Sequence, residues 1–135
     1  MLKFSFLFIF SFLELFSTNL PNLPLPVTSF GAVKVKNFVY VYSGHKGDAH
    51  VYSKDNHSDK FVRINLKTPK KWKELPFNKP MQGFGMAAYK GNIYFSGGSQ
   101  ATNNHGEKSN LSSLDEVSVF DPRKNNWEKL TSLPK

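Results

Sequence analysis

The chain has 135 residues, a net charge of +8 and no cysteine. This length is sufficient for one domain with a real core, and the lack of cysteine excludes disulfides, thiolate metal sites and a cysteine nucleophile. Only 2 of the 18 cationic residues are arginines. Because the guanidinium fork suits phosphate better than an ammonium group does, we expect a solvated basic surface and no nucleic-acid partner.

Residues 1–18 have the pattern of a secretory signal peptide. A short positive start ends at Lys3, and an unbroken run of Phe, Leu, Ile and Ser follows over residues 4–13. The run is shorter than the roughly 20 residues of a membrane-spanning helix, so we predict export to the periplasm or the medium and no stable membrane span. A membrane-held N-terminus and a buried first strand are the alternatives.

Residues 19–26 contain three prolines. Prolines at this density favour an extended backbone without a hydrogen-bond ladder. We therefore predict a Pro-rich linker at residues 19–26.

The rest of the chain repeats itself. Phe84-Gly85 follows Phe30-Gly31 by 54 residues, and Trp127 follows Trp72 by 55. A period of about 50 residues composed of short strands is typical of β-propeller blades. We therefore predict one blade at residues 27–80 and a second at residues 81–135.

Each copy contains four segments of alternating apolar residues. In the second copy these are residues 85–89, 92–96, 116–120 and 127–130. Gly91 suits a tight turn after the first segment, and Pro122 suits a turn after the third because proline has no N–H for a ladder. Enrichment in Val, Phe and Tyr favours strands, and no window has a helical period. The predicted fold class is all-β, with two four-stranded antiparallel units.

The second copy contains Tyr94, Gly97-Gly98, Phe120-Asp121-Pro122 and Trp127 at positions that suit a repeat motif. In these residues it resembles the kelch-repeat family, which includes galactose oxidase. The first copy matches less well, because it has Ser43-Gly44 in place of the double glycine. The segment at residues 42–53 is similar to the first blade of exported bacterial kelch proteins.

The resemblance implies a kelch-type β-propeller segment. Its glycines would permit a turn that a Cβ would obstruct, and Tyr94 and Trp127 would pack between strands or blades. We expect Tyr40 and Tyr94 to have like surroundings. Closed propellers have about four to eight blades, so the resemblance implies an incomplete propeller, joined by further blades of a longer chain or by self-association.

The long loop between the second and third segments of each copy carries the candidate binding groups. These loops cover residues 45–60 and 99–115, and corresponding loops of neighbouring blades lie on the same face. The spacing of the histidines matches no standard metal motif, so we predict no metal and no cofactor. The segment Gly97-Gly98-Ser99-Gln100 lacks the second glycine of a nucleophile elbow, so we predict no catalytic residue. The predicted ligand-binding residues are His45, Asp48, His50, Tyr52, Asn104 and His105.

Two functions fit this sequence. The favoured interpretation is an exported module that binds a glycan or protein partner through loops on one face, since propeller function is usually located on loops. The alternative is a fragment of a propeller enzyme acting on a sugar, similar to the exported mutarotase N-acetylneuraminate epimerase. That resemblance assigns no catalytic group to this chain.

Overall fold

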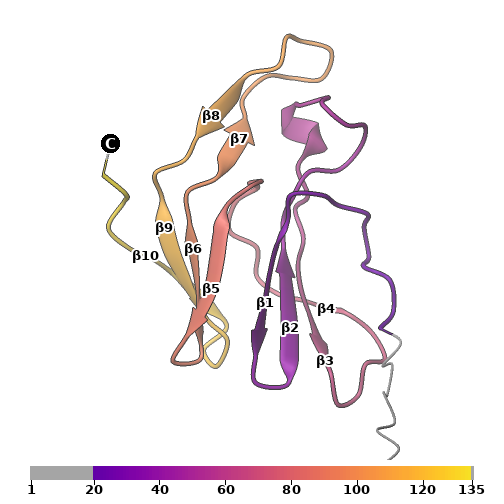
Figure 1. Cartoon of the computed structure of the whole chain (residues 1–135), viewed down its shortest axis with the longest axis vertical. Helices are drawn as coiled ribbons and strands as arrows, with labels where there is room; N and C mark the ends of the chain where they lie inside the picture. Colours follow the sequence, from indigo (N-terminus) through magenta and orange to yellow (C-terminus); the bar gives the residue numbers. More distant parts are fainter. Residues whose placement is uncertain (1–19, 135) are drawn as a thin grey trace, which may run out of the picture.

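The computed structural model describes residues 20–134, so the predicted signal peptide at residues 1–18 lies outside the described residues. Two four-stranded antiparallel sheets stand side by side, with strand orders β1-β2-β3-β4 and β10-β9-β6-β5 (Figure 1). We call them blade 1 and blade 2. The predicted all-β fold with two four-stranded antiparallel units is confirmed.

The strands of the two blades occupy corresponding places in the two copies. Blade 1 consists of β1 (Gly31–Val35), β2 (Phe38–Tyr42), β3 (Phe61–Asn65) and β4 (Lys73–Glu74). Blade 2 consists of β5 (Gly85–Tyr89), β6 (Asn92–Ser96), β9 (Val117–Asp121) and β10 (Asn126–Lys129). The loop of blade 1 holds one 3-10 turn, η1 (Lys54–Asn56), and the loop of blade 2 holds a small hairpin of β7 (Ser99–Ala101) and β8 (Leu111–Ser113).

The backbone turns recur 54 residues apart even where the residue types differ. The left-handed pairs are Ser29 and Gly83 (φ 51° and 60°), Lys36 and Lys90 (54° and 48°), Ser43 and Gly97 (49° and 64°), and Gly44 and Gly98 (106° and 90°). Ser43 departs from the double glycine but is anchored in this conformation. Its buried hydroxyl donates to the Ser58 carbonyl at 2.9 Å and accepts the Met81 N–H at 2.9 Å.

Gly98 has the role expected of a glycine after the second strand. Its φ is 90°, and an added Cβ would lie 2.7 Å from Phe84 Cβ and 2.9 Å from the Gln82 carbonyl oxygen. Real Cβ atoms do not approach backbone that closely. Only glycine therefore allows residues 82–84 to pass beside the end of β6.

The core lies between the two blades and is mainly aromatic. Tyr42 and Phe61 of blade 1 meet Phe95 and Phe120 of blade 2, and these four side chains are at most 1% exposed. The Tyr42–Phe95 ring centroids are 4.9 Å apart and the Phe61–Phe120 centroids 4.8 Å. Trp127 completes the set at 4.7 Å from the Phe95 ring. We call these five residues the interblade aromatic cluster.

Two tryptophans hold the segments that lead into each blade. The indole N–H of Trp127 donates to the Pro76 carbonyl at 2.7 Å, and that of Trp72 donates to the Pro21 carbonyl at 3.0 Å. In both cases the acceptor is 51 residues earlier in the chain. Residues 20–26, predicted to be a linker, have no regular secondary structure, and Pro21 is bonded to blade 1 as Pro76 is bonded to blade 2.

Tyr40 and Tyr94 have the same register but different surroundings, so the expectation of like surroundings is wrong. Tyr40 pairs with Val33 and Arg63, is 2% exposed and faces blade 2. Tyr94 is half-buried and lies on the opposite face of β6 from Ile93 and Phe95, which are in the core. Residues 20–134 form no third four-stranded sheet that could pack on that outer face of blade 2 as blade 2 packs on blade 1.

Replacing Trp127 with alanine should destabilise the fold by about 3 kcal/mol, at the lower end of the range for large aromatic residues because this side chain is partly buried. The substitution removes the ring contacts between the blades and leaves the Pro76 carbonyl without its donor. Urea unfolding followed by circular dichroism measures the change. Tyr89→Ala, at a ring that is 61% exposed, is the control and should change stability by no more than about 0.5 kcal/mol. Equal losses in the two variants would contradict the proposed importance of the cluster.

Candidate functional site

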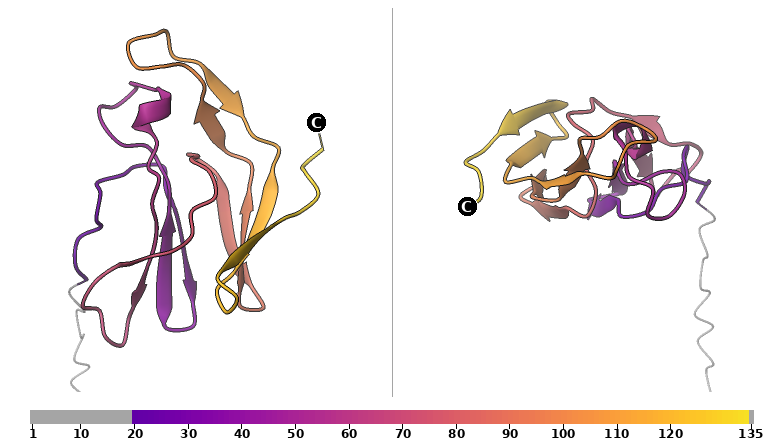
Figure 2. Two further views of the ribbon diagram at one scale, coloured as in Figure 1. Left: turned by 180° about the vertical axis from the view of Figure 1, so that it is seen from behind. Right: turned by 90° about the horizontal axis from the view of Figure 1, so that it is seen from above.

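The two long loops lie at the same end of the molecule, opposite the β1–β2 and β5–β6 turns (Figures 1 and 2). The loop of blade 1 covers residues 43–60, and that of blade 2 covers residues 97–116. The β7–β8 hairpin within the second loop was not predicted. Its central pair, Gln100 with Ser112, is polar on both strands, so the sequence has no apolar alternation there to indicate strands.

The loops of the two blades lie on the same face, as expected from the sequence, and they are bonded to each other. The Lys54 N–H donates to the Asn103 carbonyl at 3.0 Å, and the Asn103 side-chain amide donates to the Tyr52 carbonyl at 2.7 Å. The Ala101 N–H donates to His57 Nε2 at 2.7 Å. These three hydrogen bonds and a fourth, from the Lys54 ammonium to Asn104, join η1 and its neighbours to the β7–β8 hairpin. The two loops therefore form one surface, which we call the loop surface.

Four of the six predicted binding residues lie together on the first loop. The Tyr52 ring centroid is 5.2 Å from that of His45 and 6.5 Å from that of His50. His45 is 6% exposed and bonds through Nε2 to the Asp48 carbonyl at 3.0 Å. Asp48 and His50 are exposed and Tyr52 is half-buried. His45 therefore supports this loop from beneath, while the other three present side chains to solvent.

The other two predicted residues are on the second loop. Asn104 is exposed and accepts a hydrogen bond from the Lys54 ammonium at 3.3 Å. Glu107 accepts from both the backbone and the side chain of Asn104, and these bonds lower the pKa of its carboxyl. His105 is exposed beside them. The binding role of all six residues stays a prediction.

Asn103 and His57 belong to these loops but were not among the predicted binding residues. Both are buried, at 7% and 4% exposed, and each bonds to the opposite loop. Their spacing carries no sequence signal, since a polar residue in a long loop is usually solvated. Only the fold shows that they join the blades.

His57 and His45 form a buried imidazole pair. They face each other in an isolated antiparallel bridge flanked by the bonds Lys46 N–H to Asn56 O and Ser58 N–H to Gly44 O. In such a pair the side chains lie on the same face at close spacing. His57 Nε2 accepts the hydrogen bond from the Ala101 N–H. The ring is therefore neutral and carries its proton on Nδ1. Burial lowers the pKa of His57, and the neighbouring His45 and Lys46 lower it further.

A cavity of about 390 Å³ opens at the edge of the loop surface. Two of the predicted residues, His45 and Asp48, line it together with Thr28 and Gly47.

Residues 20–134 contain no group of three or more His, Cys, Asp or Glu side chains placed to hold a metal ion. The same residues include no helix long and apolar enough to cross a membrane.

Two adjacent four-stranded blades with long loops joined at one end define a β-propeller segment. Residues 80–134 match the family model for the kelch motif. The chain is therefore a β-propeller segment in which residues 80–134, which include blade 2, match the kelch motif.

Comparison with solved structures gives the same fold. Over 85% of its length the chain matches the structure of YjhT, a kelch propeller protein, with a TM-score of 0.64 and 21% sequence identity. The chain spans 30% of that structure. No curated protein matches the chain. A closed ring of this type would need further blades from elsewhere.

Lowering the pH should destabilise the folded chain because protonation of His57 is unfavourable in the joined loops. Because the folded-state pKa lies below the ordinary 6.5, the unfolded chain takes up a proton first as the pH falls. Stability contributed by neutral His57 is therefore complete above about pH 6.5 and is lost from there down toward the folded pKa. Urea unfolding between about pH 7.5 and 5 measures this slope.

The control variants separate this effect from other acid-sensitive groups. His57→Gln retains an acceptor for the Ala101 N–H without a titrating ring, so the slope should flatten. His50→Gln, at an exposed ring on the same loop, should leave the slope as it is. The lowered pKa values of Asp121, about 2, and of Glu107 affect stability only below their ordinary values of 3.8 and 4.5. An unchanged slope in His57→Gln would show that His57 is not responsible.

Proposed function

We propose that this chain is a binding module of a kelch-type propeller and that the loop surface binds a protein or glycan partner. The observation that carries the proposal is the set of hydrogen bonds joining the two loops. Loops held in place lose less conformational entropy on binding than free loops do. They also present exposed groups from both blades, including Asp48, His50 and His105, in fixed relative positions.

The character of the loop surface favours a protein partner over a glycan. Each loop exposes one aliphatic side chain, with Val51 42% and Leu111 41% exposed. These lie among polar groups, a mixture that is typical of protein interfaces with an apolar centre and a polar rim. A glycan would instead use the Tyr52 ring and the neighbouring donors.

Site-specific cross-linking tests the loop surface directly. We expect benzoylphenylalanine placed at His50 or His105 of the full chain to cross-link to a defined partner in the source cells. The same probe at Lys67, in the turn after β3 at the opposite end, is the control and should give no such product. Mass spectrometry identifies the partner, and a glycan array run with the purified chain covers the carbohydrate case.

Variants then connect binding to the named side chains. His50→Ala and Asn104→Ala should weaken binding of the identified partner or glycan, while stability changes by no more than about 0.5 kcal/mol, as is usual for exposed positions. Cross-linking that is equal from both ends, or absent from the loop end, would refute the proposed site. An unfolded His50→Ala protein would show that the loop is structural.

We also propose that the chain is exported. The support is the positive start and the apolar run at residues 4–13. Fractionation of cells producing the full chain should place it outside the cytoplasm, with an N-terminus near Thr18 or Asn19. Replacing Leu7 and Ile9 with aspartate should retain the uncleaved chain in the cytoplasm, because the apolar run is then interrupted. Export of that variant would contradict the proposal.

The alternative function, a fragment of an enzyme acting on a sugar, stays a prediction, since no observation on residues 20–134 favours it.

A further inference from the structure

A second hollow lies between the blades at the end opposite the loop surface. Its volume is about 280 Å³. Blade 1 contributes Lys36, Tyr40 and Arg63 to its lining, and blade 2 contributes Lys90, Pro122 and Arg123. We call it the interblade pocket. The loop surface and the interblade pocket share no residue, so binding at this pocket is independent of the proposed function.

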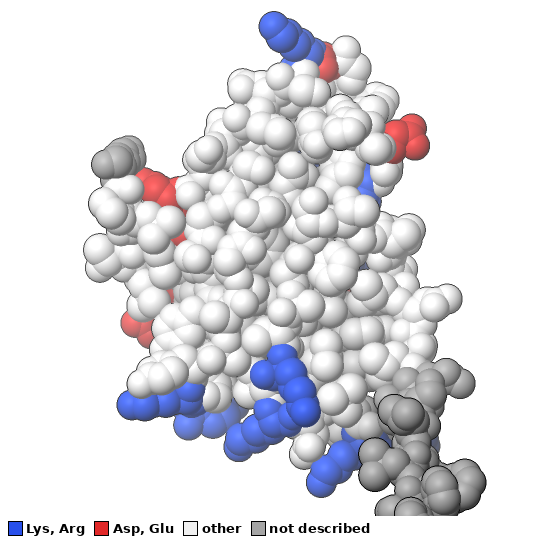
Figure 3. Space-filling view, in the orientation of Figure 1, with Lys and Arg blue, Asp and Glu red and all other residues white. Residues whose placement is uncertain are grey.

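The interblade pocket is strongly basic. Four of the lining residues are cationic and none is acidic. Arg123 is paired with Asp121 at 3.1 Å, whereas Lys36, Arg63 and Lys90 form no ion pair with any residue in the range 20–134. Lys and Arg also gather at this end of the molecule in the space-filling view (Figure 3). Like charges held together without a counter-charge favour an anion between them.

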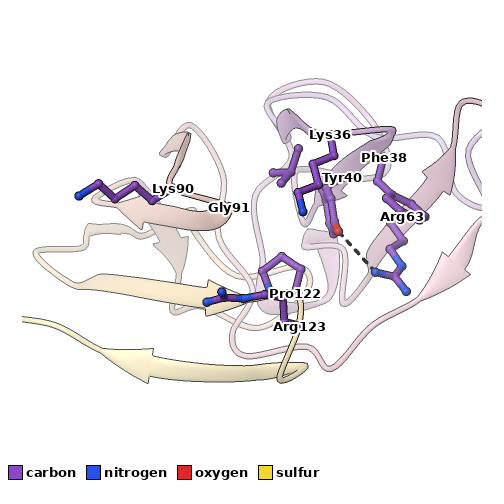
Figure 4. Close-up of a pocket in the computed structure, with 9 residues that line it drawn as sticks. Lys36, Phe38, Tyr40, Arg63, Lys90, Gly91, Pro122 and Arg123 are labelled. Carbon is purple, nitrogen blue, oxygen red and sulfur yellow. Dashed lines mark hydrogen bonds between the residues drawn. The ribbon is translucent and has the colours of Figure 1, made fainter.

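Two donors of the interblade pocket, Arg63 and Tyr40, are held in place by their neighbours. The Arg63 guanidinium lies over the Phe38 ring, 4.7 Å from its centroid, and its Nη1 donates to the Tyr40 hydroxyl at 3.4 Å. Tyr40 itself is 2% exposed. Figure 4 shows Lys36, Tyr40 and Arg63 with their polar ends on one side of the pocket beside Pro122, while Lys90 and Arg123 extend away. Three donors therefore meet at one place, and the other two cations add to the field.

The blade fold does not require this arrangement. In blade 2 the positions equivalent to Phe38 and Arg63 are occupied by Asn92 and Val119, as the registers Tyr40–Arg63 and Tyr94–Val119 show. Blade 2 forms the same sheet without the stacked guanidinium. A half-buried arginine on a sheet face loses hydration, and folding alone gives no reason to place it there.

We propose that the interblade pocket binds an oxyanion, the sulfate, phosphate or carboxylate group of a small ligand, with Lys36, Tyr40 and Arg63 as donors. The guanidinium offers parallel N–H groups to two oxygens, the form of bond that is strongest for such anions. The Tyr40 hydroxyl accepts from Arg63 and has its own proton to donate. The volume suits a single group on a ligand about as large as a monosaccharide.

The test follows backbone NMR signals of the ¹⁵N-labelled full chain during titration with sodium sulfate, at ionic strength kept constant with sodium chloride. We expect saturable shifts at residues 36, 40, 63 and 90, and no comparable shifts on the loop surface. A second titration uses a glucose sulfate, which carries the same oxyanion on a sugar. Tighter binding of the glucose sulfate would assign the site to an anionic sugar, and equal binding would assign it to the free ion.

Variants decide between a built site and general attraction to a basic surface. Arg63→Met retains an unbranched apolar stem over Phe38 and removes the charge, and it should weaken sulfate binding about tenfold or more. Lys36→Met, at an exposed residue whose replacement does not threaten folding, should also weaken it. Lys67→Met removes a charge at the same basic end but outside the pocket, and should leave the affinity unchanged. Absence of saturation, or equal losses in Lys67→Met and Lys36→Met, would overturn the proposal.

Discussion

The interblade aromatic cluster is the contact on which the rest of the structure depends. Neither blade can bury its own inner face, since a sheet needs a second layer to exclude water. Tyr42 lies at the centre of the cluster, and its hydroxyl also donates to the Lys79 carbonyl at 2.6 Å and accepts the Lys79 N–H at 2.9 Å. Burial raises its pKa to about 12. One side chain therefore joins the two sheets and fixes the connection between them.

The same packing determines what lies at each end of the blades. Once the aromatic rings fix the angle between the sheets, the β2–β3 and β6–β9 loops emerge side by side and can hydrogen-bond through Asn103 and His57. At the other end a gap between the two sheets forms the interblade pocket. Tyr40 and Arg63, which are hydrogen-bonded to each other, are polar residues of its lining. Both candidate sites are therefore properties of the pair of blades, and neither belongs to one blade alone.

The sequence predicted what depends on local pattern and on the repeat. The alternating apolar segments predicted the strands of the two blades. The alignment of Trp72 with Trp127 predicted that they occupy equivalent positions, and in the structure both indoles donate to carbonyls 51 residues earlier. The sequence could not predict contacts between residues that are far apart in the chain. Nothing local distinguishes buried His57 from exposed His50, or shows that Arg63 stacks on Phe38, because those contacts arise only when strands far apart in the chain are brought together.

Comparing the copies position by position separates architecture from function. Where the backbone repeats and the residue type also repeats, as with Trp72 and Trp127, the fold itself explains the choice. Where the backbone conformation repeats but the residue type differs, the fold does not explain which residue is present. His45 and Ser99 occupy the same bridged position, with Thr28 and Gln82 as partners, yet only His45 faces a second imidazole. Arg63 and Val119 differ in the same way. Residues peculiar to blade 1 thus coincide with the loop surface and with the interblade pocket, and this divergence between equivalent positions is the physical reason for seeking function there.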